Sequence, residues 1–198
     1  MEIVQVIKKN QKQIIRQLVR FIKEGKIIVC PTDTVYGFLA DATDKKAVER
    51  VFKIKKRPKN KAVPIFIKDI KSAKKLAFID KEQEKFLKKN WPGKITVVLK
   101  ARRNLGLPKL LFEKNRIGLR IPDYKLVNQL LKKLNRPLTA TSANISGNPA
   151  STRIRKILKQ FKDQKIQPDL VLDAGNLPES KPSKVIDLTK NKPKILRK

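Results

Sequence analysis

A single three-layer α/β domain is the fold class that this sequence predicts, and three observations lead to it. The chain has 198 residues, an ordinary length for one domain with its own apolar core. Short apolar runs that suit buried strands alternate with segments whose apolar residues have helical spacing. No internal repeat and no long linker divides residues 1–198. About seven strands mixed with four or five helices therefore predict one mixed α/β domain.

Predicted elements follow one another closely in the first half of the chain. Asn10 is placed to cap a helix whose apolar residues have helical spacing, and Gly25 is placed to end it. Asp44 and Asp80 are the expected N-caps of two further helices, and Pro58 stops the first of these two. Strands are predicted at Lys26–Cys30, Val63–Ile67 and Ile95–Lys100, with a turn at Trp91-Pro92-Gly93.

The second half continues the alternation. Ile117–Ile121 is a predicted strand, and a helix is expected to begin at Asp123. Pro137–Thr141 is a short strand-like segment that runs into a loop rich in Ser, Asn and Gly. A basic helix is expected from about Thr152 to Lys162. The remaining strands are predicted near Leu170–Asp173, Val185–Leu188 and Ile195–Arg197.

A large excess of positive charge is the most unusual feature of the composition. The 49 Lys and Arg residues stand against 17 Asp and Glu, which gives a formal net charge of +32. Most of the basic residues are Lys, spread along the whole chain, and this is typical of a lysine-rich proteome. The charge also favours an anionic partner such as nucleic acid, a nucleotide or an acidic membrane surface. Both interpretations stay open, because scattered Lys is weaker evidence than a clustered basic stripe.

The single Cys and the absence of His exclude several chemistries. The chain has no material for a His/Cys zinc site, a Ser-His-Asp triad or a Cys-His nucleophile. Cys30 ends an apolar run and is expected to be a buried, reduced thiol. The first residues lack the apolar core of a signal peptide, and no apolar run approaches membrane length. We therefore expect a cytoplasmic protein with no membrane partner.

Thr32-Asp33-Thr34 follows a predicted buried strand, at the position where α/β folds place ligands. On extended backbone both threonine hydroxyls would face the same side. Taken alone, the pattern favours an ordinary strand end, because Thr has a high strand propensity. A plain strand end does not explain the continuation into Val35-Tyr36-Gly37, which reaches a tight, small-residue position.

Lys55 and Arg57 are expected at the C-terminal end of a helix. Cations there are mildly stabilising, by about 0.3–1 kcal/mol, and in so basic a chain they occur often by chance. The functional interpretation is a guanidinium fork and an ammonium that bind phosphate oxygens at a transferring phosphorus. Arg is scarce in this chain, so an Arg where Lys would serve as solubilising charge favours the second interpretation.

Two further segments have the character of a binding site. Residues 142–147, Ser-Ala-Asn-Ile-Ser-Gly, are either a polar turn or a nest of N–H groups and hydroxyls for phosphate, and they lack the Gly-Lys-Ser/Thr of a Walker A loop. Arg120 lies inside an otherwise apolar strand, so it points either to solvent or into a cavity. An inward Arg needs an anion, and a ligand carboxylate is the expected partner.

In their order and spacing these motifs resemble the YrdC/TsaC family, the threonylcarbamoyl-AMP synthases of tRNA modification. The resemblance extends from about Ile27 to Arg197 and includes Gly118-Leu119-Arg120-Ile121-Pro122 and Ser183-Lys184-Val185-Ile186-Asp187. It implies a twisted, mixed open sheet with a large positively charged cavity on one face. The chain is similar to the short form, without the extra C-terminal domain of some relatives.

The resemblance also implies roles for individual residues. Residues that match the L-threonine site are Thr34, Arg120 and Ser183. Residues that match the ATP site are Arg57, Ser142, Asn144, Ser146 and Arg197. Lys55 and Arg57 are the expected catalytic pair, and no metal ligand is expected. Further candidates are Thr32, Tyr36 and Lys61.

Several positions depart from the family pattern. Lys61 and Phe66 stand where relatives often carry Asn and His, so part of the threonine pocket differs. Leu39 replaces a second glycine after Tyr36-Gly37. Arg116 stands at a site that often bears a small hydroxyl residue, and Ala150 stands where a serine is common.

The implied reaction combines L-threonine, bicarbonate and ATP into threonylcarbamoyl-AMP and pyrophosphate, for transfer to tRNA by a partner enzyme. A carbamate is already an anionic nucleophile, so positioning and charge neutralisation suffice without histidine. Mg²⁺ is expected to arrive with ATP. The alternative is a non-catalytic protein that binds double-stranded RNA or tRNA. A third candidate, a carbamoyl-transfer domain like those of hydrogenase maturation proteins, normally lies in longer, metal-binding chains.

The clustering of basic residues distinguishes the two main candidates. A shape-reading RNA module would gather its basic residues on one outer face, whereas a synthase would direct Arg57, Arg120 and Arg197 into one pocket.

We predict weak binding to tRNA and unrelated duplex RNA alike, with strong salt sensitivity, because dispersed Lys residues do not read a shape. Six to ten phosphate contacts would cost about 10³–10⁵ in affinity between 50 and 200 mM salt. Filter binding across a salt series measures this. Tight, tRNA-selective binding that persists at high salt would instead favour the RNA-binding protein.

Overall fold

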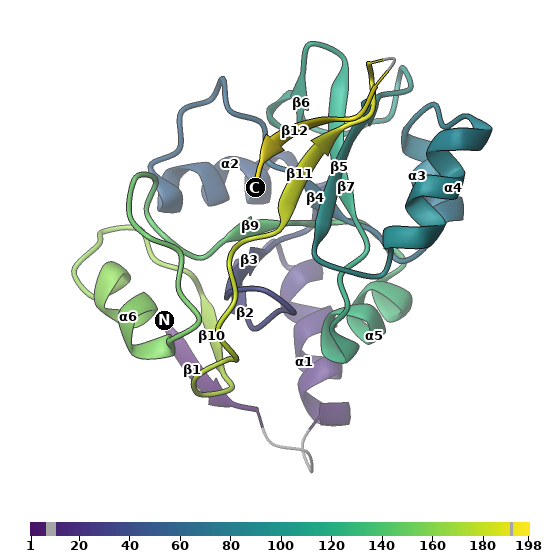
Figure 1. The fold of residues 1–198 in the computed structure, drawn as a ribbon. Coiled ribbons are helices and arrows are strands. Elements are labelled where there is room, and N and C mark those ends of the chain that lie inside the picture. The colour runs from purple at the N-terminus through teal and green to yellow at the C-terminus, as the bar shows by residue number, and fades with distance from the viewer. Residues whose placement is uncertain (7–10, 191) are drawn as a thin grey trace.

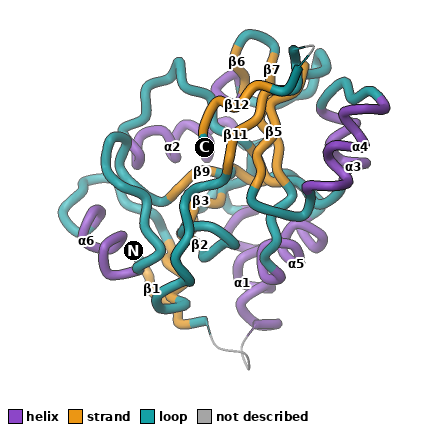
Figure 2. Tube along the Cα trace, in the orientation of Figure 1, coloured by secondary structure: helices purple, strands orange, loops and turns teal. Residues whose placement is uncertain are grey.

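Two β-sheets surrounded by helices make up the structure (Figure 1), a computed structural model that describes residues 1–6, 11–190 and 192–198. Helices in these ranges are α1 (Gln11–Lys23), α2 (Lys45–Lys55), α3 (Ile70–Leu76), α4 (Lys81–Asn90), α5 (Lys125–Leu134) and α6 (Ile154–Phe161). Figure 2 shows them around the outside of the strands. The predicted α/β fold class is confirmed, but one sheet was expected where the structure has two.

The first sheet has five strands in the order β1-β10-β2-β3-β9. Their bounds are β1 (Glu2–Gln5), β10 (Leu170–Asp173), β2 (Ile28–Cys30), β3 (Gly37–Leu39) and β9 (Thr141–Ser142). Strands β1, β10 and β2 run parallel, and β3 is antiparallel to both β2 and β9. Apolar residues of α1 and α5 pack on one face, and those of α2 and α6 pack on the other. This part is therefore the predicted three-layer unit.

The second sheet is mixed and open, with seven strands. Its order is β12 (Lys194–Arg197), β11 (Lys184–Asp187), β5 (Ile95–Lys100), β7 (Arg116–Arg120), β4 (Ile65–Phe66) and β8 (Leu138–Thr139), and β6 (Phe112–Glu113) pairs with β7. Strands β11 and β5 are parallel, as are β4 and β7, while β5 and β7 are antiparallel. Helices α3 and α4 contribute to the apolar core of this sheet.

The alternation of side chains in β5 and β7 separates a core face from a polar face. Successive strand residues point to opposite faces, so odd and even positions have different environments here. The odd-numbered residues lie in the apolar core: Val97, Leu99, Ile117 and Leu119. The even-numbered residues line a cavity: Thr96, Val98, Arg116, Gly118 and Arg120. One face of this sheet is therefore free to build a site.

Several predicted elements match the structure closely. Asp44 caps α2 by accepting from Lys46 N at 2.8 Å, and Asp80 caps α4 in a capping box with Gln83. Strands β5 and β10 have the predicted bounds. Cys30 is fully buried, as expected.

Other predictions were wrong in detail. Helix α5 was expected to begin at Asp123, but its N-cap is Tyr124, and no side chain caps it. The Asp123 backbone N donates to Asp33 Oδ2. Helix α2 ends before Pro58, with Lys56 in the left-handed conformation at φ 49°. Pro137–Thr141 is divided between β8 and β9, which belong to different sheets.

Some elements were not predicted at all. Helix α3 and strands β1, β3 and β6 were missed. Most are too short for a clear period, although Asp69, which caps α3, was a usable signal. The predicted cap Asn10 lies outside the described residues.

Gly118 allows Pro64 to approach β7 closely, and we predict that Gly118→Ala destabilises the protein. A Cβ at this position would lie 2.9 Å from Pro64 Cβ, so the strand or the proline must shift. We expect a loss of about 1–3 kcal/mol in the free energy of unfolding, measured by urea denaturation. Gly106→Ala, which adds backbone strain at φ +64° but meets no atom within 4 Å, is the comparison. An unchanged midpoint for Gly118→Ala would contradict the packing argument.

Candidate active site

A cavity of about 270 Å³ lies between the two sheets. The five-stranded sheet and its loops contribute Thr32, Thr34, Val35, Gly37, Thr141 and Ser142 to the lining. The seven-stranded sheet contributes, among others, Phe66, Thr96, Arg120, Val185 and Arg197. Arg57, from the segment after α2, completes the polar wall. Residues from distant parts of the sequence therefore meet around one volume.

The loop after β2 places two hydroxyls in the wall through a turn rather than an extended strand. Thr32 Oγ1 donates to Val35 O at 2.7 Å and accepts from Thr34 N at 3.1 Å. It also lies 3.1 Å from Thr34 Oγ1. Because the Thr32 proton is already used, Thr34 is the donor of this pair. Thr34 therefore offers a ligand an acceptor lone pair, which suits an N–H or O–H group.

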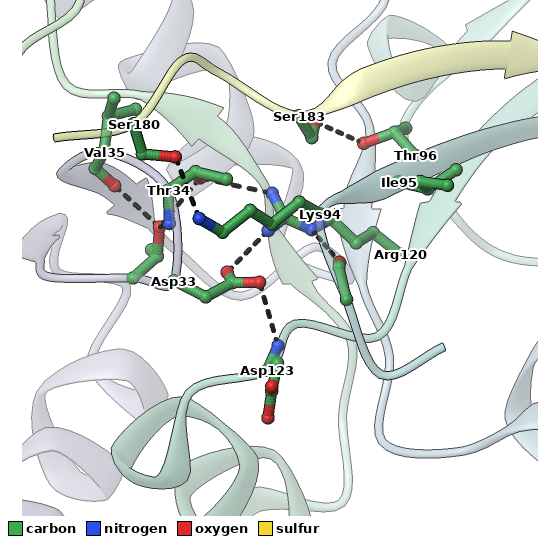
Figure 3. Close-up of polar contacts among 12 residues, drawn as sticks. Asp33, Thr34, Val35, Lys94, Ile95, Thr96, Arg120, Asp123, Ser180 and Ser183 are labelled. Atoms are coloured by element: carbon green, nitrogen blue, oxygen red, sulfur yellow. Dashed lines mark hydrogen bonds and ion pairs between the residues drawn. The ribbon is translucent and has the colours of Figure 1, made fainter. Parts of the chain in front are cut away.

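Arg120 is a buried cation at the same end of the cavity, with 4% of its surface exposed. Its Nη2 lies 2.5 Å from Asp33 Oδ1, its Nε donates to Gly93 O at 2.9 Å, and its Nη1 lies 3.4 Å from Thr34 Oγ1. Figure 3 shows the contacts from Asp33 and Thr34 meeting at the guanidinium. Burial lowers the pKa of Arg120, and Asp33 partly offsets this. Arg120 therefore faces the cavity with an internal partner, whereas the sequence suggested a ligand carboxylate alone.

Arg57 and Arg197 bring further positive charge to the cavity. Arg57 is held by Lys61 O at 2.8 Å and Ala62 O at 2.9 Å. Burial and then the charge of Arg197 lower the pKa of Arg57, and burial and then the charge of Arg120 lower that of Arg197. Because neighbouring positive charges lower the pKa of Arg57 and Arg197 in this way, a bound anion would stabilise both guanidinium groups.

Ser183 links the third arginine to the sheet. Arg197 donates to Ser183 O from Nε at 2.9 Å and from Nη2 at 2.7 Å. Ser183 Oγ lies 2.8 Å from Thr96 Oγ1. Arg197 Nη2 donates to Ser183 Oγ at 3.2 Å. The hydroxyls of Ser183 and Thr96 are therefore fixed by each other in the cavity wall.

Lys55 lies behind the wall rather than in it. Its side chain is buried, and Nζ contacts Ser142 O at 2.5 Å, Asn144 O at 2.9 Å and Asn144 Oδ1 at 3.1 Å. Burial, followed by the charge of Arg57, lowers the pKa of Lys55 to about 7. All three ammonium directions point at protein acceptors, so Lys55 supports the 142–144 segment in this arrangement. Direct contact between Lys55 and a substrate stays a prediction.

The remaining predicted residues also lie outside the cavity lining. Asn144 accepts from Ser142 Oγ at 2.6 Å and so orients that hydroxyl. Ser146 Oγ is buried without a partner among the described residues. Tyr36 is buried, its OH donates to Gly175 O at 2.7 Å, and burial raises its pKa to about 12. Lys61 is exposed and contributes its backbone oxygen to Arg57.

Four polar lining residues were not predicted as site residues: Thr96, Glu113, Arg116 and Thr141. Thr96 and Arg116 share the face of Arg120 at even positions of β5 and β7, a signal that the strand period contained. Glu113 lines the cavity and contacts Arg116 Nη2 at 3.2 Å. Arg116 Nη1 also lies 3.0 Å from Asp187 Oδ2. The contact between Glu113 and Arg116 depends on the pairing of β6 with β7, which the sequence did not reveal.

The described ranges contain neither a metal-binding cluster nor a membrane-spanning helix. They contain no group of three or more His, Cys, Asp or Glu residues placed to hold a metal ion. No helix among them has the length and apolar character that a membrane crossing requires.

Comparisons with known proteins agree with the fold and identify the family. The Sua5/YciO/YrdC family model, described as telomere recombination, matches residues 20–198. A putative threonylcarbamoyl-AMP synthase of Methanocaldococcus jannaschii is 36% identical over 191 residues, which are 96% of this chain and 88% of that protein. The threonylcarbamoyl-AMP synthase of Pyrococcus abyssi is 34% identical over 98% of this chain, which spans only 56% of that longer relative.

Solved structures of Sua5 and YciO proteins are also similar to this chain. P. abyssi Sua5 complexed with L-threonine is 33% identical and superimposes with a TM-score of 0.90, over 100% of this chain and 57% of that chain. Escherichia coli YciO is 28% identical with a TM-score of 0.86, over 100% of this chain and 94% of that chain.

The lowered pKa of Lys55 predicts a pH-dependent stability. The unfolded chain holds a proton on Lys55 up to about pH 10.5, whereas the folded chain loses it near pH 7. Unfolding therefore takes up protons between these values, and the contribution of Lys55 to stability rises with pH across this window. Urea unfolding of the wild type and Lys55→Met at pH 7, 8 and 9 measures it. We expect the difference between the two free energies of unfolding to grow in favour of the wild type, and a constant difference would show that the three oxygens keep Lys55 charged.

Proposed function

The chain belongs to the Sua5/YciO/YrdC family, and we propose that it is an L-threonylcarbamoyladenylate synthase. This nucleotidyltransferase would form threonylcarbamoyl-AMP and pyrophosphate from L-threonine, bicarbonate or CO₂, and ATP. The activity named for its relatives supports the proposal.

Four arginines line the cavity, and Arg116 among them is paired with Glu113 and Asp187. The convergence of the other three is the observation that carries the proposal. Arg57, Arg120 and Arg197 come from three separate parts of the chain, and all three line the same volume. A dispersed, solvent-exposed set of cations would bind a nucleic acid backbone but would have no reason to meet in a cavity. Inward guanidinium groups instead match a compact anionic ligand such as a nucleoside triphosphate together with a carboxylate.

The proposed chemistry proceeds in two steps. The threonine amine attacks the carbon of CO₂, or of bicarbonate with loss of hydroxide, and gives up a proton to form a carbamate. A carbamate oxygen then attacks the α-phosphorus of ATP, and the bond from that phosphorus to the β-phosphate oxygen breaks to release pyrophosphate. Negative charge on the phosphoryl oxygens is the main obstacle, so fixed cations are the main requirement.

The lining residues divide into two groups by position. Arg57 and Arg197 would bind phosphate oxygens. The Ser142 hydroxyl donates to Asn144 in this arrangement and would join them by turning its proton to a phosphate oxygen. Arg120 would bind the threonine carboxylate, and the free acceptor of Thr34 suits the threonine amine or hydroxyl. Ser183 lies beside Arg197, at the place where the two substrates would meet.

Mg²⁺ fits this site only in part. Glu113 is the one carboxylate among the described lining residues, and Arg116 contacts one of its oxygens. The ion would therefore be held mainly by ATP oxygens and water, where it would neutralise phosphate charge.

A tRNA-modifying transferase would be the downstream partner that receives threonylcarbamoyl-AMP, because a mixed carbamic–phosphoric anhydride is an activated donor. Weak RNA binding by the basic surface is compatible with this role. The inward arginines do not support the alternative of a non-catalytic RNA-binding protein.

The test is pyrophosphate release by the purified chain with ATP and Mg²⁺. We predict that turnover requires both L-threonine and bicarbonate and proceeds without RNA. Omitting each component in turn is the control. Equal release without threonine would contradict the assignment.

Replacing Arg57 tests the phosphate contact. We expect Arg57→Ala to lower kcat/KM by about 10²-fold or more, because a preorganised cation near the transferring phosphorus is lost. Lys53→Ala, which removes an exposed cation from the same region of α2, is the matched control and should be nearly neutral. Activity of Arg57→Ala within a few-fold of the wild type would show that Arg57 does not contact the phosphates.

A further inference from the structure

We propose that Asp33, which lies outside the cavity lining, is a positioning residue that orients Arg120 toward the carboxylate of the amino-acid substrate. This role rests on the proposed function, because it concerns the amino-acid end of the same cavity. Asp33 would contact no substrate and would act through the guanidinium alone.

Asp33 joins three parts of the fold through one buried carboxylate. Oδ1 contacts Arg120 Nη2 at 2.5 Å, and Oδ2 accepts from the backbone N of Asp123 at 3.0 Å. The side chain of Asp33 is 6% exposed, and that of Arg120 is 5% exposed. Figure 3 shows Asp33 between Arg120 and Asp123. The carboxylate therefore connects the loop after β2, the end of β7 and the segment that leads into α5.

The remaining contacts of Arg120 explain why this carboxylate matters. A guanidinium has five N–H groups, and three of those of Arg120 point at Gly93 O, Thr34 Oγ1 and Asp33. The other two have no acceptor among the described residues, and two N–H groups are what a carboxylate needs for a bidentate contact. The Phe66 ring lies 5.5 Å from the Arg120 guanidinium carbon, so it restricts one face of the group. Of the polar contacts, the one with Asp33 is the shortest.

Asparagine cannot replace Asp33 in this position. Both carboxylate oxygens accept from N–H donors, one on Arg120 and one on the Asp123 backbone. The amide of Asn has one acceptor oxygen, and its NH₂ group would face a donor. Asp33→Asn therefore breaks one of the two connections while it keeps the size of the side chain.

The chain offers a matched control in a second buried Asp. Asp41 is 2% exposed, contacts Arg136 Nη1 at 2.8 Å and also accepts from the Thr43 backbone N at 2.8 Å. Neither Asp41 nor Arg136 lines the active-site cavity. Arg136 is half exposed, so what Asp41→Asn reproduces is the loss of a buried carboxylate that accepts from an Arg and from a backbone N, away from the substrate.

The experiment measures steady-state pyrophosphate release with threonine varied at saturating ATP, and with ATP varied at saturating threonine, together with the Tm. For Asp33→Asn we expect KM for threonine to rise by about 10-fold or more, with KM for ATP within about 3-fold of the wild type. Asp41→Asn should leave both KM values within about 2-fold. Asp33→Ser, which keeps one acceptor in a smaller side chain, should repeat the selective loss for threonine.

Several outcomes would overturn the proposal. An unchanged or lower KM for threonine in Asp33→Asn would show that Asp33 is irrelevant or competes with the substrate carboxylate. An equal loss for both substrates, or failure of both Asp33 variants to fold, would show that Asp33 serves the fold rather than the subsite. A wild-type chain without threonine-dependent release would remove the proposed function and this role together, whereas a normal wild type with unaffected variants would remove this role alone.

Discussion

The buried contact between Arg120 and Asp33 is the interaction on which the geometry of the site depends, because it joins the two sheets at the cavity. Arg120 belongs to the seven-stranded sheet, whereas Asp33 follows β2 of the five-stranded sheet. Each group would be costly to bury alone, so the pair constrains the two sheets to one relative position. Lys55 makes a buried connection within the five-stranded part of the fold, between the end of α2 and the segment that contains β9. Polar contacts beside the cavity therefore fix the position of residues in its wall.

The cations at the site are of two kinds: one is bound entirely by protein oxygens, and the others also face the cavity, where a ligand could bind them. Lys55 is surrounded by three protein oxygens, so its charge is used to hold the 142–144 segment. Arg120, Arg57 and Arg197 are each anchored by protein acceptors on one side and face the cavity on the other. A guanidinium suits both tasks because it has five donors in a rigid plane, whereas an ammonium has fewer directions to divide. This difference explains why the cavity contains arginines in a chain whose surface charge is mostly lysine.

Two departures from the family pattern alter this cavity. Phe66 lines it and lies against Arg120, so the position that often carries His supplies an apolar face and no hydrogen bond. Arg116 lines the other end of β7 and is neutralised by Glu113 and Asp187. Arg116 therefore changes the charge of the cavity little. It reduces the space in the cavity more, because a long side chain stands where a small hydroxyl residue is common. Both changes leave the three inward arginines in place.

The sequence by itself determined the local features: the fold class, the caps at Asp44 and Asp80, the strand 95–100 and the identity of the polar clusters. These follow from periods and side-chain capping, which act over a few residues. The tertiary structure decided which polar groups face the cavity. Lys55 and Arg57 are two residues apart, yet only Arg57 lines the cavity, because Lys55 is satisfied by oxygens near residue 144 that no local pattern predicts. Arg120 likewise found its partner in Asp33, which lies far away in the chain and near in space. The balance between burial and pairing of a charge depends on neighbours that only the packed sheets supply.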